Sequence, residues 1–186
     1  AGLGYQSVEL CAPPGYESSG FGPVMKIKAP EMKKIVEDAG LILESTHYGM
    51  GELRNNLSER IDFALGSGQK QMICSSFWLP KDAKMSDWLK AVDELNEIGA
   101  KTKKAGIQTG FHNHHTEFGK IDDKLIYDAL MENFDADLVK MQFQVAVISI
   151  GYKAATYFNK YPGRFISAHL ADWSATTDKQ VPIGQG

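Results

Sequence analysis

Hydrophobic residues along this chain recur at two alternating spacings. Short runs with apolar side chains two positions apart, typical of strands, are separated by longer stretches with apolar residues every three or four positions, typical of helices. Strands are expected over residues 5–10, 41–49, 71–78, 107–115, the start of 138–150, and 165–173. Helices are expected over residues 29–40, 53–68, 85–106, 123–134 and 152–164. Strict alternation of this kind favours parallel strands joined by right-handed crossovers.

The helices carry apolar stripes that should face a sheet. These stripes are Met32, Ile35, Val36 and Ala39; then Leu53, Leu57, Ile61 and Leu65; then Trp88, Val92 and Leu95. Residues 12–23 and 174–186 read as loops. The pattern fits a (β/α) barrel or a doubly wound sheet, and the absence of a GxGxxG or P-loop motif weakens the nucleotide-binding versions of the latter. No boundary or repeat divides the chain, so a single domain over 1–186 is expected.

Composition narrows the class of protein. The chain has 186 residues, 43% hydrophobic content and a formal net charge of -3, as expected for one globular domain. A mildly acidic chain matches a nucleic-acid backbone poorly. No apolar run reaches the roughly 18 residues of a membrane helix, so no membrane partner is expected. The chain opens without a signal-peptide pattern. We therefore expect a cytoplasmic protein, with export left open because the sequence can start inside a longer precursor.

Two cysteines and five histidines are the reactive side chains that stand out. Cys11 and Cys74 lack metal-ligand spacing, which favours buried free thiols over a disulfide. Three of the histidines gather in one stretch, "GFHNHHTEF", residues 110–118. Such a stretch is either the catalytic end of a strand or a polar loop rich in histidine.

Polar side chains recur near the C-terminal ends of five predicted strands. They are Glu9, His47, His112 with His114, Gln144 and His169. Strand side chains alternate between faces, so each set points away from the helix side. Active sites of parallel α/β barrels sit at that end. A single histidine of this kind is usually a satisfied core residue, but burying all of them costs roughly 1–3 kcal/mol each unless they find partners. A shared metal or substrate would supply those partners.

Glu117 lies past its strand, in a predicted loop. It is either a solvated surface acid or a base or ligand folded over the mouth of the site. Several aromatic residues fall at or just after strand ends, where they either stack on a sugar ring or pack the mouth: Tyr48, Phe77, Trp78, Phe111 and Trp173.

Five motifs, taken together and in order, resemble the sugar phosphate isomerase/epimerase superfamily of xylose isomerase-like TIM barrels. They are "GYQSVEL", "ESTHYGMGEL", "GFHNHHTEF", "YPGRFISAHLADW" and "VPIGQG", and they span nearly the whole chain. The resemblance implies a (β/α)8 barrel, here with about six β/α units and without the first unit and the last strand. Whole barrels of this type have about 250 residues. A partial record of a whole barrel is favoured over a stable truncated fold, because an open arc would leave two unpaired edges.

The resemblance also implies a divalent metal and places its ligands. His169 matches a histidine ligand, His112 replaces a glutamate ligand, and Gln144 replaces an aspartate ligand. This set suits Zn²⁺, Mn²⁺, Co²⁺ or Mg²⁺, with weaker binding than a carboxylate-rich set. His47 matches a substrate-side histidine, and Ala171 stands where many members have lysine. The usual catalytic glutamates have no evident match, so Glu117 and Glu9 are the candidate substitutes. The candidate catalytic residues are therefore Glu117, His114, His47 and Glu9.

The implied function is an isomerase or epimerase that uses the metal to stabilise an enediolate during proton transfer next to a sugar carbonyl. Tyr48, Phe77, Trp78 and Trp173 are the candidate substrate contacts. Three rivals remain: a keto-sugar or inosose-type dehydratase on the same site, a non-catalytic sugar-binding barrel, and a metal-dependent nuclease, which the acidic balance disfavours. A small-molecule sugar is the expected partner, and a homo-oligomer stays open.

Overall fold

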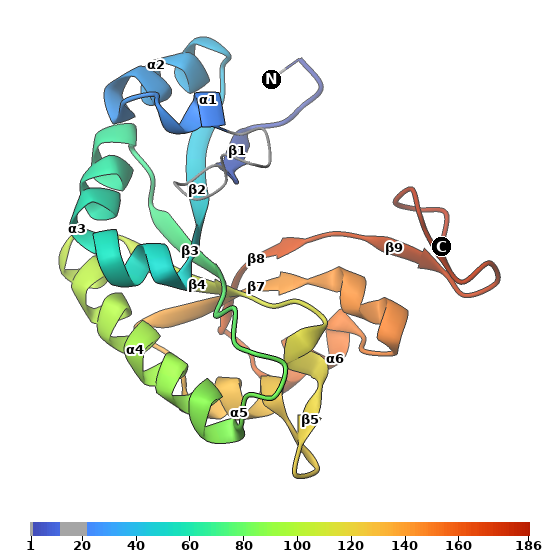
Figure 1. Cartoon of the computed structure of the whole chain (residues 1–186). Coiled ribbons are helices and arrows are strands. Elements are labelled where there is room, and N and C mark those ends of the chain that lie inside the picture. Colours follow the sequence, from blue (N-terminus) through green and yellow to red (C-terminus); the bar gives the residue numbers. More distant parts are fainter. Residues whose placement is uncertain (1, 12–21) are drawn as a thin grey trace. The chain divides into compact units, whose positions relative to one another are not determined.

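The computed structural model describes residues 2–11 and 22–186, which group into two compact units (Figure 1). Unit 1 comprises residues 1–78 and 97–109, and unit 2 comprises residues 79–96 and 110–186. Most of the loop expected over 12–23 lies outside the described residues, and its end forms a short helix, α1 (Gly22–Met25).

The expected alternation of strands and helices is confirmed. The six-stranded sheet has the order β1 (Ser7–Leu10), β2 (Ile42–Gly49), β3 (Gln71–Ser76), β4 (Gln108–His112), β7 (Val139–Gln144) and β8 (Phe165–His169). The helices between these strands are α2 (Ala29–Asp38), α3 (Met50–Ser67), α4 (Met85–Lys104), α5 (Ile126–Asn133) and α6 (Ala154–Lys160). Neighbours within each unit, β1–β2, β2–β3 and β7–β8, pair in parallel.

In unit 1, α2 and α3 pack on each other and along β2 (Figure 1). Met32, Val36 and Leu43 form the buried centre of this layer. The expected stripes are only partly right, because Ile35 of α2 is 48% exposed and Leu65 of α3 is 52% exposed. In α3 the cause is local: Asn56 has non-helical φ/ψ of -128° and 24°, which shifts the phase of the second half of the helix.

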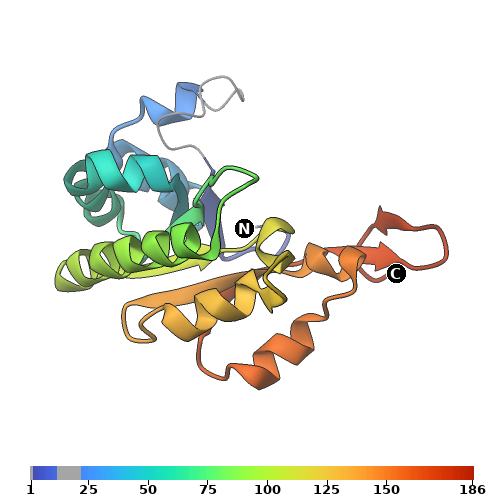
Figure 2. The same cartoon turned by 60° about the horizontal axis from the view of Figure 1, so that its bottom comes forward.

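In unit 2, α5 and α6 lie beside β7 (Figure 2). An aromatic cluster joins these three elements. The ring centroid of Phe143 of β7, which is fully buried, lies 5.9 Å from that of Tyr127 of α5 and 5.7 Å from that of Tyr157 of α6. Arg164, just before β8, donates hydrogen bonds to the carbonyl oxygens of Met131 and Phe134 at the end of α5. Phe143 therefore faces the helices.

Two short hairpins follow strand ends, and sequence patterns missed both. The tail expected to be a loop contains β10 (Lys179–Val181), which pairs antiparallel with β9 (Asp172–Ser174). The run expected to continue from β8 through Trp173 is therefore two strands. The second hairpin is β5 (Lys120–Ile121) with β6 (Lys124–Leu125), and its turn has left-handed φ values of 49° at Asp122 and 61° at Asp123. Short, mostly polar strands lack the apolar alternation on which the prediction rests.

The apolar run after β7 is also not strand. Residues Val145–Ile150 form a 3-10 helix, η3, which ends at Gly151 with a φ of 91°. A second 3-10 turn, η2 (Thr116–Phe118), follows β4. Both segments lie past C-terminal strand ends, where loops carry function in parallel α/β folds.

Both cysteines are free thiols, as expected, but only Cys74 is buried. Cys11 is exposed, because it follows the edge strand β1 instead of entering the core. Among the described residues, no helix combines the length and the apolar character needed to cross a membrane.

Candidate functional site

In unit 1, a carboxylate holds His47 at one ring nitrogen. Glu9 of β1 and His47 of β2 approach to 3.0 Å between Oε1 and Nε2, and the Ser45 hydroxyl donates to the other carboxylate oxygen at 2.5 Å. The register of the two strands, with Glu9 opposite Ser45, produces this arrangement. His47 is 6% exposed. A carboxylate at one imidazole nitrogen sets the tautomer and the ring orientation, as it does for metal-binding histidines.

In unit 2, three imidazoles lie side by side at strand ends. The ring centroids of His112 on β4 and His169 on β8 are 4.5 Å apart, and those of His112 and His114 are 4.8 Å apart. His112 is 2% exposed. The sequence expectation that strands far apart in the chain bring His112 and His169 together is therefore met within this unit.

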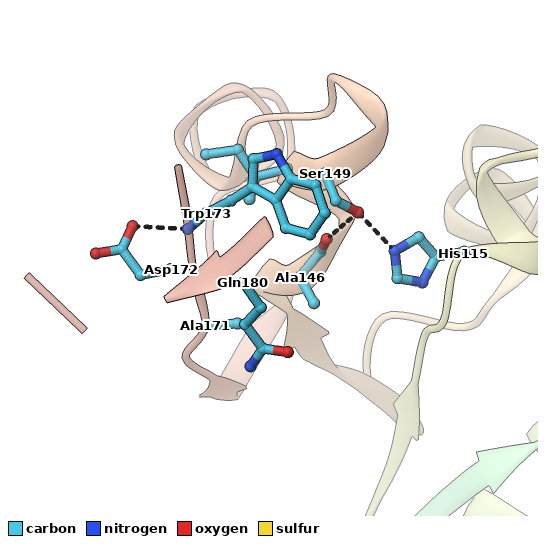
Figure 3. A pocket seen from close by; sticks show the side chains of 8 residues that line it. His115, Ala146, Ser149, Ala171, Asp172, Trp173 and Gln180 are labelled. Carbon is cyan, nitrogen blue, oxygen red and sulfur yellow. Dashed lines mark hydrogen bonds between the residues drawn. The ribbon is translucent and has the colours of Figure 1, made fainter. Parts of the chain in front are cut away.

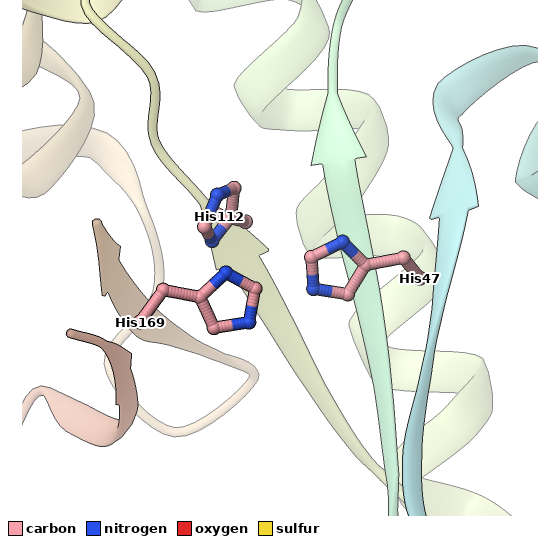
Figure 4. A group of neighbouring side chains, drawn as sticks. All are labelled: His47, His112 and His169. Carbon is pink, nitrogen blue, oxygen red and sulfur yellow. The ribbon is translucent and has the colours of Figure 1, made fainter. Parts of the chain in front are cut away.

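Figure 4 draws His112 and His169 of unit 2, whose ring nitrogens could together hold a metal ion, and His47 of unit 1. Histidine nitrogen is a common ligand for Zn²⁺, Cu²⁺, Ni²⁺ and Fe²⁺, so the chemistry of His112 and His169 fits a divalent transition ion. The expected catalytic role of His47 on the substrate side stays a prediction.

Gln144 ends β7 directly opposite His169 in the strand register. Its side-chain oxygen accepts a hydrogen bond from the backbone N–H of Ala146 at 3.5 Å, which caps η3. Its own backbone N–H donates to the side-chain oxygen of Asn113 at 3.1 Å. Asn113 is fully buried and ties the end of β4 to the end of β7. Sequence reasoning passed over Asn113 because it lies on the face opposite the histidines.

Glu117 is a buried acid, not a solvated one. It is 1% exposed within η2, and its Oε2 accepts a hydrogen bond from the backbone N–H of His114 at 2.7 Å. Burial raises the pKa of this carboxyl, and backbone hydrogen bonds from His114 and from Glu117 itself offset part of that rise. A buried carboxyl with a raised pKa suits proton transfer better than a surface acid would.

Trp173 lines a pocket of about 130 Å³ in unit 2 (Figure 3). The other lining residues are His115, Ala146, Ile148, Ser149, Ala171, Asp172 and Gln180. His115 Nε2 and Ser149 Oγ are 2.9 Å apart, and the Ser149 hydroxyl donates to the carbonyl oxygen of Ala146 at 2.8 Å. Neither His115 nor Ser149 was singled out from sequence, because the signal for them is the packing of η3 against β9.

The remaining aromatic candidates differ in exposure. Tyr48 is 1% exposed, and burial raises its pKa to about 12. Phe77 is 6% exposed. Trp78 is 69% exposed and has a left-handed φ of 52°, a conformation that is uncommon for a bulky residue and is found at functional sites.

Comparison with solved structures identifies the fold. A sugar phosphate isomerase/epimerase from Parabacteroides distasonis superposes with a TM-score of 0.79 and 26% identity, over 92% of this chain and 66% of that one. A second sugar phosphate isomerase/epimerase from the same organism superposes with a TM-score of 0.78 and 21% identity, over 100% of this chain and 72% of that one. A Bacillus anthracis protein assigned as a 3-DHS dehydratase involved in petrobactin synthesis superposes with a TM-score of 0.68 and 9% identity, over 94% of this chain and 65% of that one.

This chain is therefore an α/β fold with six parallel strands that corresponds to part of a xylose isomerase-like TIM barrel. It spans 66% of the length of the first of these structures. No protein-family model and no curated protein matches the sequence. The structural neighbours include both isomerases/epimerases and a dehydratase, so the fold is shared by more than one chemistry.

Proposed function

We propose that this chain carries the metal-binding site of an enzyme that moves a proton next to a sugar carbonyl, as an isomerase or epimerase. The observation that carries the proposal is the 4.5 Å separation of the His112 and His169 rings at the ends of β4 and β8. Two imidazoles at this separation can bind one ion. The 26% identity with a sugar phosphate isomerase/epimerase supports the choice of reaction class.

His112 and His169 are the proposed core ligands, with Gln144, which lies opposite His169 in the strand register, as a further candidate. In unit 1, we propose His47 as a catalytic histidine whose ring is oriented by the Glu9 carboxylate at Nε2. When bound, a divalent ion would polarise the sugar carbonyl and increase the acidity of the neighbouring C–H group. Because the ligands are neutral nitrogens, we propose that Zn²⁺ or Co²⁺ binds in preference to Mg²⁺.

Glu117 is the proposed acid–base group. Its raised pKa lets it exchange a proton closer to neutral pH than a solvated carboxylate does. The backbone N–H of His114 holds one of its oxygens, which fixes the direction in which the other can accept a proton. The His114 ring lies 4.8 Å from the His112 ring, and we propose His114 as the second proton-transfer group.

Metal content tests the site directly. We expect elemental mass spectrometry of the purified protein to find a stoichiometric transition ion, and the His112→Ala and His169→Ala variants to lose it. His115→Ala is the matched control, because this histidine contacts Ser149 and not the ring cluster. A protein that binds no divalent ion would favour the rival reading of a non-catalytic sugar-binding barrel.

Product analysis separates the two reactions that this site could support. Proton removal next to the carbonyl is common to both, and the lyase differs only in the departure of a β-hydroxyl group. Incubation with a ketohexose and with a 3-keto-glucoside, followed by NMR of the products, gives an epimer or isomer if the proposal holds. Loss of water would instead assign the dehydratase reaction.

A further inference from the structure

The pocket beside Trp173 is built from four separate segments of unit 2. Trp173 and Asp172 belong to β9, Gln180 to β10, Ser149 to η3, and His115 follows β4 (Figure 3). At about 130 Å³ the pocket is well below the roughly 300–1,000 Å³ of sites for drug-sized ligands. It can therefore take one edge or face of a single small ring.

The hydrogen bonds around Ser149 limit what the pocket can do. The Ser149 hydroxyl has one proton, which it gives to the Ala146 carbonyl at 2.8 Å. The Nε2 atom of His115 lies 2.9 Å from the same Ser149 oxygen. It must therefore donate its N–H to that oxygen and cannot act as a base toward Ser149. This arrangement does not activate Ser149 as a nucleophile. It leaves the second lone pair of Ser149 Oγ as a fixed acceptor, which suits a ligand hydroxyl.

The other lining groups match an uncharged polar ring. The indole of Trp173 provides an aromatic face, and the Gln180 amide can both donate and accept hydrogen bonds (Figure 3). The eight lining residues include no lysine or arginine, the usual ligands of phosphate. The one ionised acid is Asp172, whose carboxylate accepts from the backbone N–H groups of Trp173, Gly184 and Gly186. That carboxylate is held by the backbone of the tail, and its negative charge adds nothing that would attract an anionic ligand.

We propose that this pocket binds the ring of a neutral, unphosphorylated sugar through stacking on Trp173 and hydrogen bonds to Ser149 and Gln180. This proposal takes from the proposed function only the expectation that the ligand is a sugar. It narrows the class of substrate from sugar phosphates to neutral sugars or glycosides. Binding in the pocket does not depend on the histidine cluster.

Tryptophan fluorescence of the purified protein, titrated with methyl β-D-glucopyranoside and methyl α-D-mannopyranoside, tests the pocket. Neither methyl glycoside can open to a carbonyl, so binding is measured without any reaction at the histidine cluster. We expect a saturable change with at least one of them. We expect glucose 6-phosphate to bind at least about tenfold more weakly, because its charge is unmatched.

Matched variants locate the signal. Trp173→Phe should abolish the fluorescence change, whereas Trp88→Phe, which removes the buried indole of α4, should keep it. Trp173→Ala and Ser149→Ala, followed by calorimetry, should each weaken binding by about three- to tenfold. The proposal is overturned if neither glycoside gives a saturable signal, if glucose 6-phosphate binds as tightly, or if Trp173→Phe leaves the signal unchanged.

One further variant keeps the two proposals distinct. In His169→Ala, which should lose the metal, the glycoside should still bind with unchanged affinity. If it does, failure of the metal experiments would leave the sugar pocket standing. If binding disappears together with the metal, the ring binds at the histidine cluster and the Trp173 pocket is not its site.

Discussion

The layer under α2 in unit 1 and the aromatic cluster in unit 2 are enclosed to different degrees. In unit 1, the buried residues Met32, Val36 and Leu43 are bordered by partly buried residues such as Val8, and Ile42, on the same strand as Leu43, is 59% exposed. In unit 2, Phe143 and Tyr127 are fully buried within a group of aromatic rings. Because stabilisation grows with the apolar area removed from water, Phe143 should contribute more to stability than Leu43.

The same difference extends to the candidate site. His112 follows the fully buried Phe111 on β4, whose ring centroid lies 5.4 Å from that of Phe134, so packing sets the strand position. His47 lies in the buried second half of β2, and a contact with the Glu9 carboxylate orients its ring. Unit 2 therefore places its histidines by packing, whereas unit 1 places its histidine by a polar contact. Mutations should separate the two modes.

Removing a core ring should have the largest effect. We expect Phe143→Ala to lower the free energy of unfolding by about 3–5 kcal/mol, because the aromatic neighbours cannot close the cavity. Leu43→Ala in unit 1 should lower the free energy of unfolding by about 2 kcal/mol, since its partly exposed surroundings can relax. Urea denaturation monitored by circular dichroism gives both values. An equal loss in the two variants would contradict the difference between the cores.

Losing the carboxylate that orients His47 should have the next largest effect. We expect Glu9→Gln to lower the free energy of unfolding by about 1–3 kcal/mol, because the buried His47 ring loses its carboxylate partner. Urea denaturation measures this. Glu44→Gln is the matched control, because Glu44 lies on the same strand as His47 and accepts a hydrogen bond from Gln71 instead. Unchanged stability in Glu9→Gln would mean that packing alone places His47.

Apolar periodicity predicted much of this fold because the sheet strands and helices are long enough to show it. The stretch 85–104, with Trp88, Val92 and Leu95 buried, keeps one helical phase throughout. Periodicity failed where local geometry decides. Asn56 breaks the phase of α3, and Gly151 ends a 3-10 turn in an apolar run that reads like strand. The β9–β10 hairpin depends on contacts of the Asp172 carboxylate that no apolar spacing records.

Part of the site was predictable for the same reason. Alternation along β4 placed His112 and His114 on one face, and the strand-end rule brought His169 toward them. The burial of Glu117 was not predictable, because it depends on how η2 folds back so that the backbone N–H of His114 meets the carboxylate. The pairing of His115 with Ser149 joins residues 34 positions apart, outside any strand pattern.

A smaller effect should come from the charge of Glu117. Its folded-state pKa is raised above the ordinary value of 4.5, so ionisation disfavours the folded state. The contribution of Glu117 to folding stability is fully present below its unfolded-state pKa. It is lost as pH rises through its folded-state pKa. We therefore expect Glu117→Gln to gain stability relative to the parent protein as pH rises from 4.5 toward neutral. Urea midpoints across this range, with the exposed Glu132→Gln as control, test the sign. If the stability gained by Glu117→Gln instead grew toward acid pH, the predicted sign would be wrong.

The smallest and most local effect should follow from Asp172→Asn. The Asp172 carboxylate accepts hydrogen bonds from the backbone N–H groups of Trp173 and Gly184 at 2.9 and 2.7 Å, and these bonds lower its pKa. Because the pKa is lowered, the contribution of this carboxylate to stability is present above the unfolded-state pKa of 3.8. It is lost as pH falls through the folded-state pKa. We expect faster solvent exchange of the Gly184 amide in Asp172→Asn by NMR, with Phe143 and its core unaffected. Asp178→Asn, in the turn of the same hairpin, is the matched control because asparagine tolerates its left-handed φ of 54°. If the exchange of Gly184 did not change, the β9–β10 hairpin would be held by packing like the rest of unit 2, and the polar mode of positioning would be confined to unit 1.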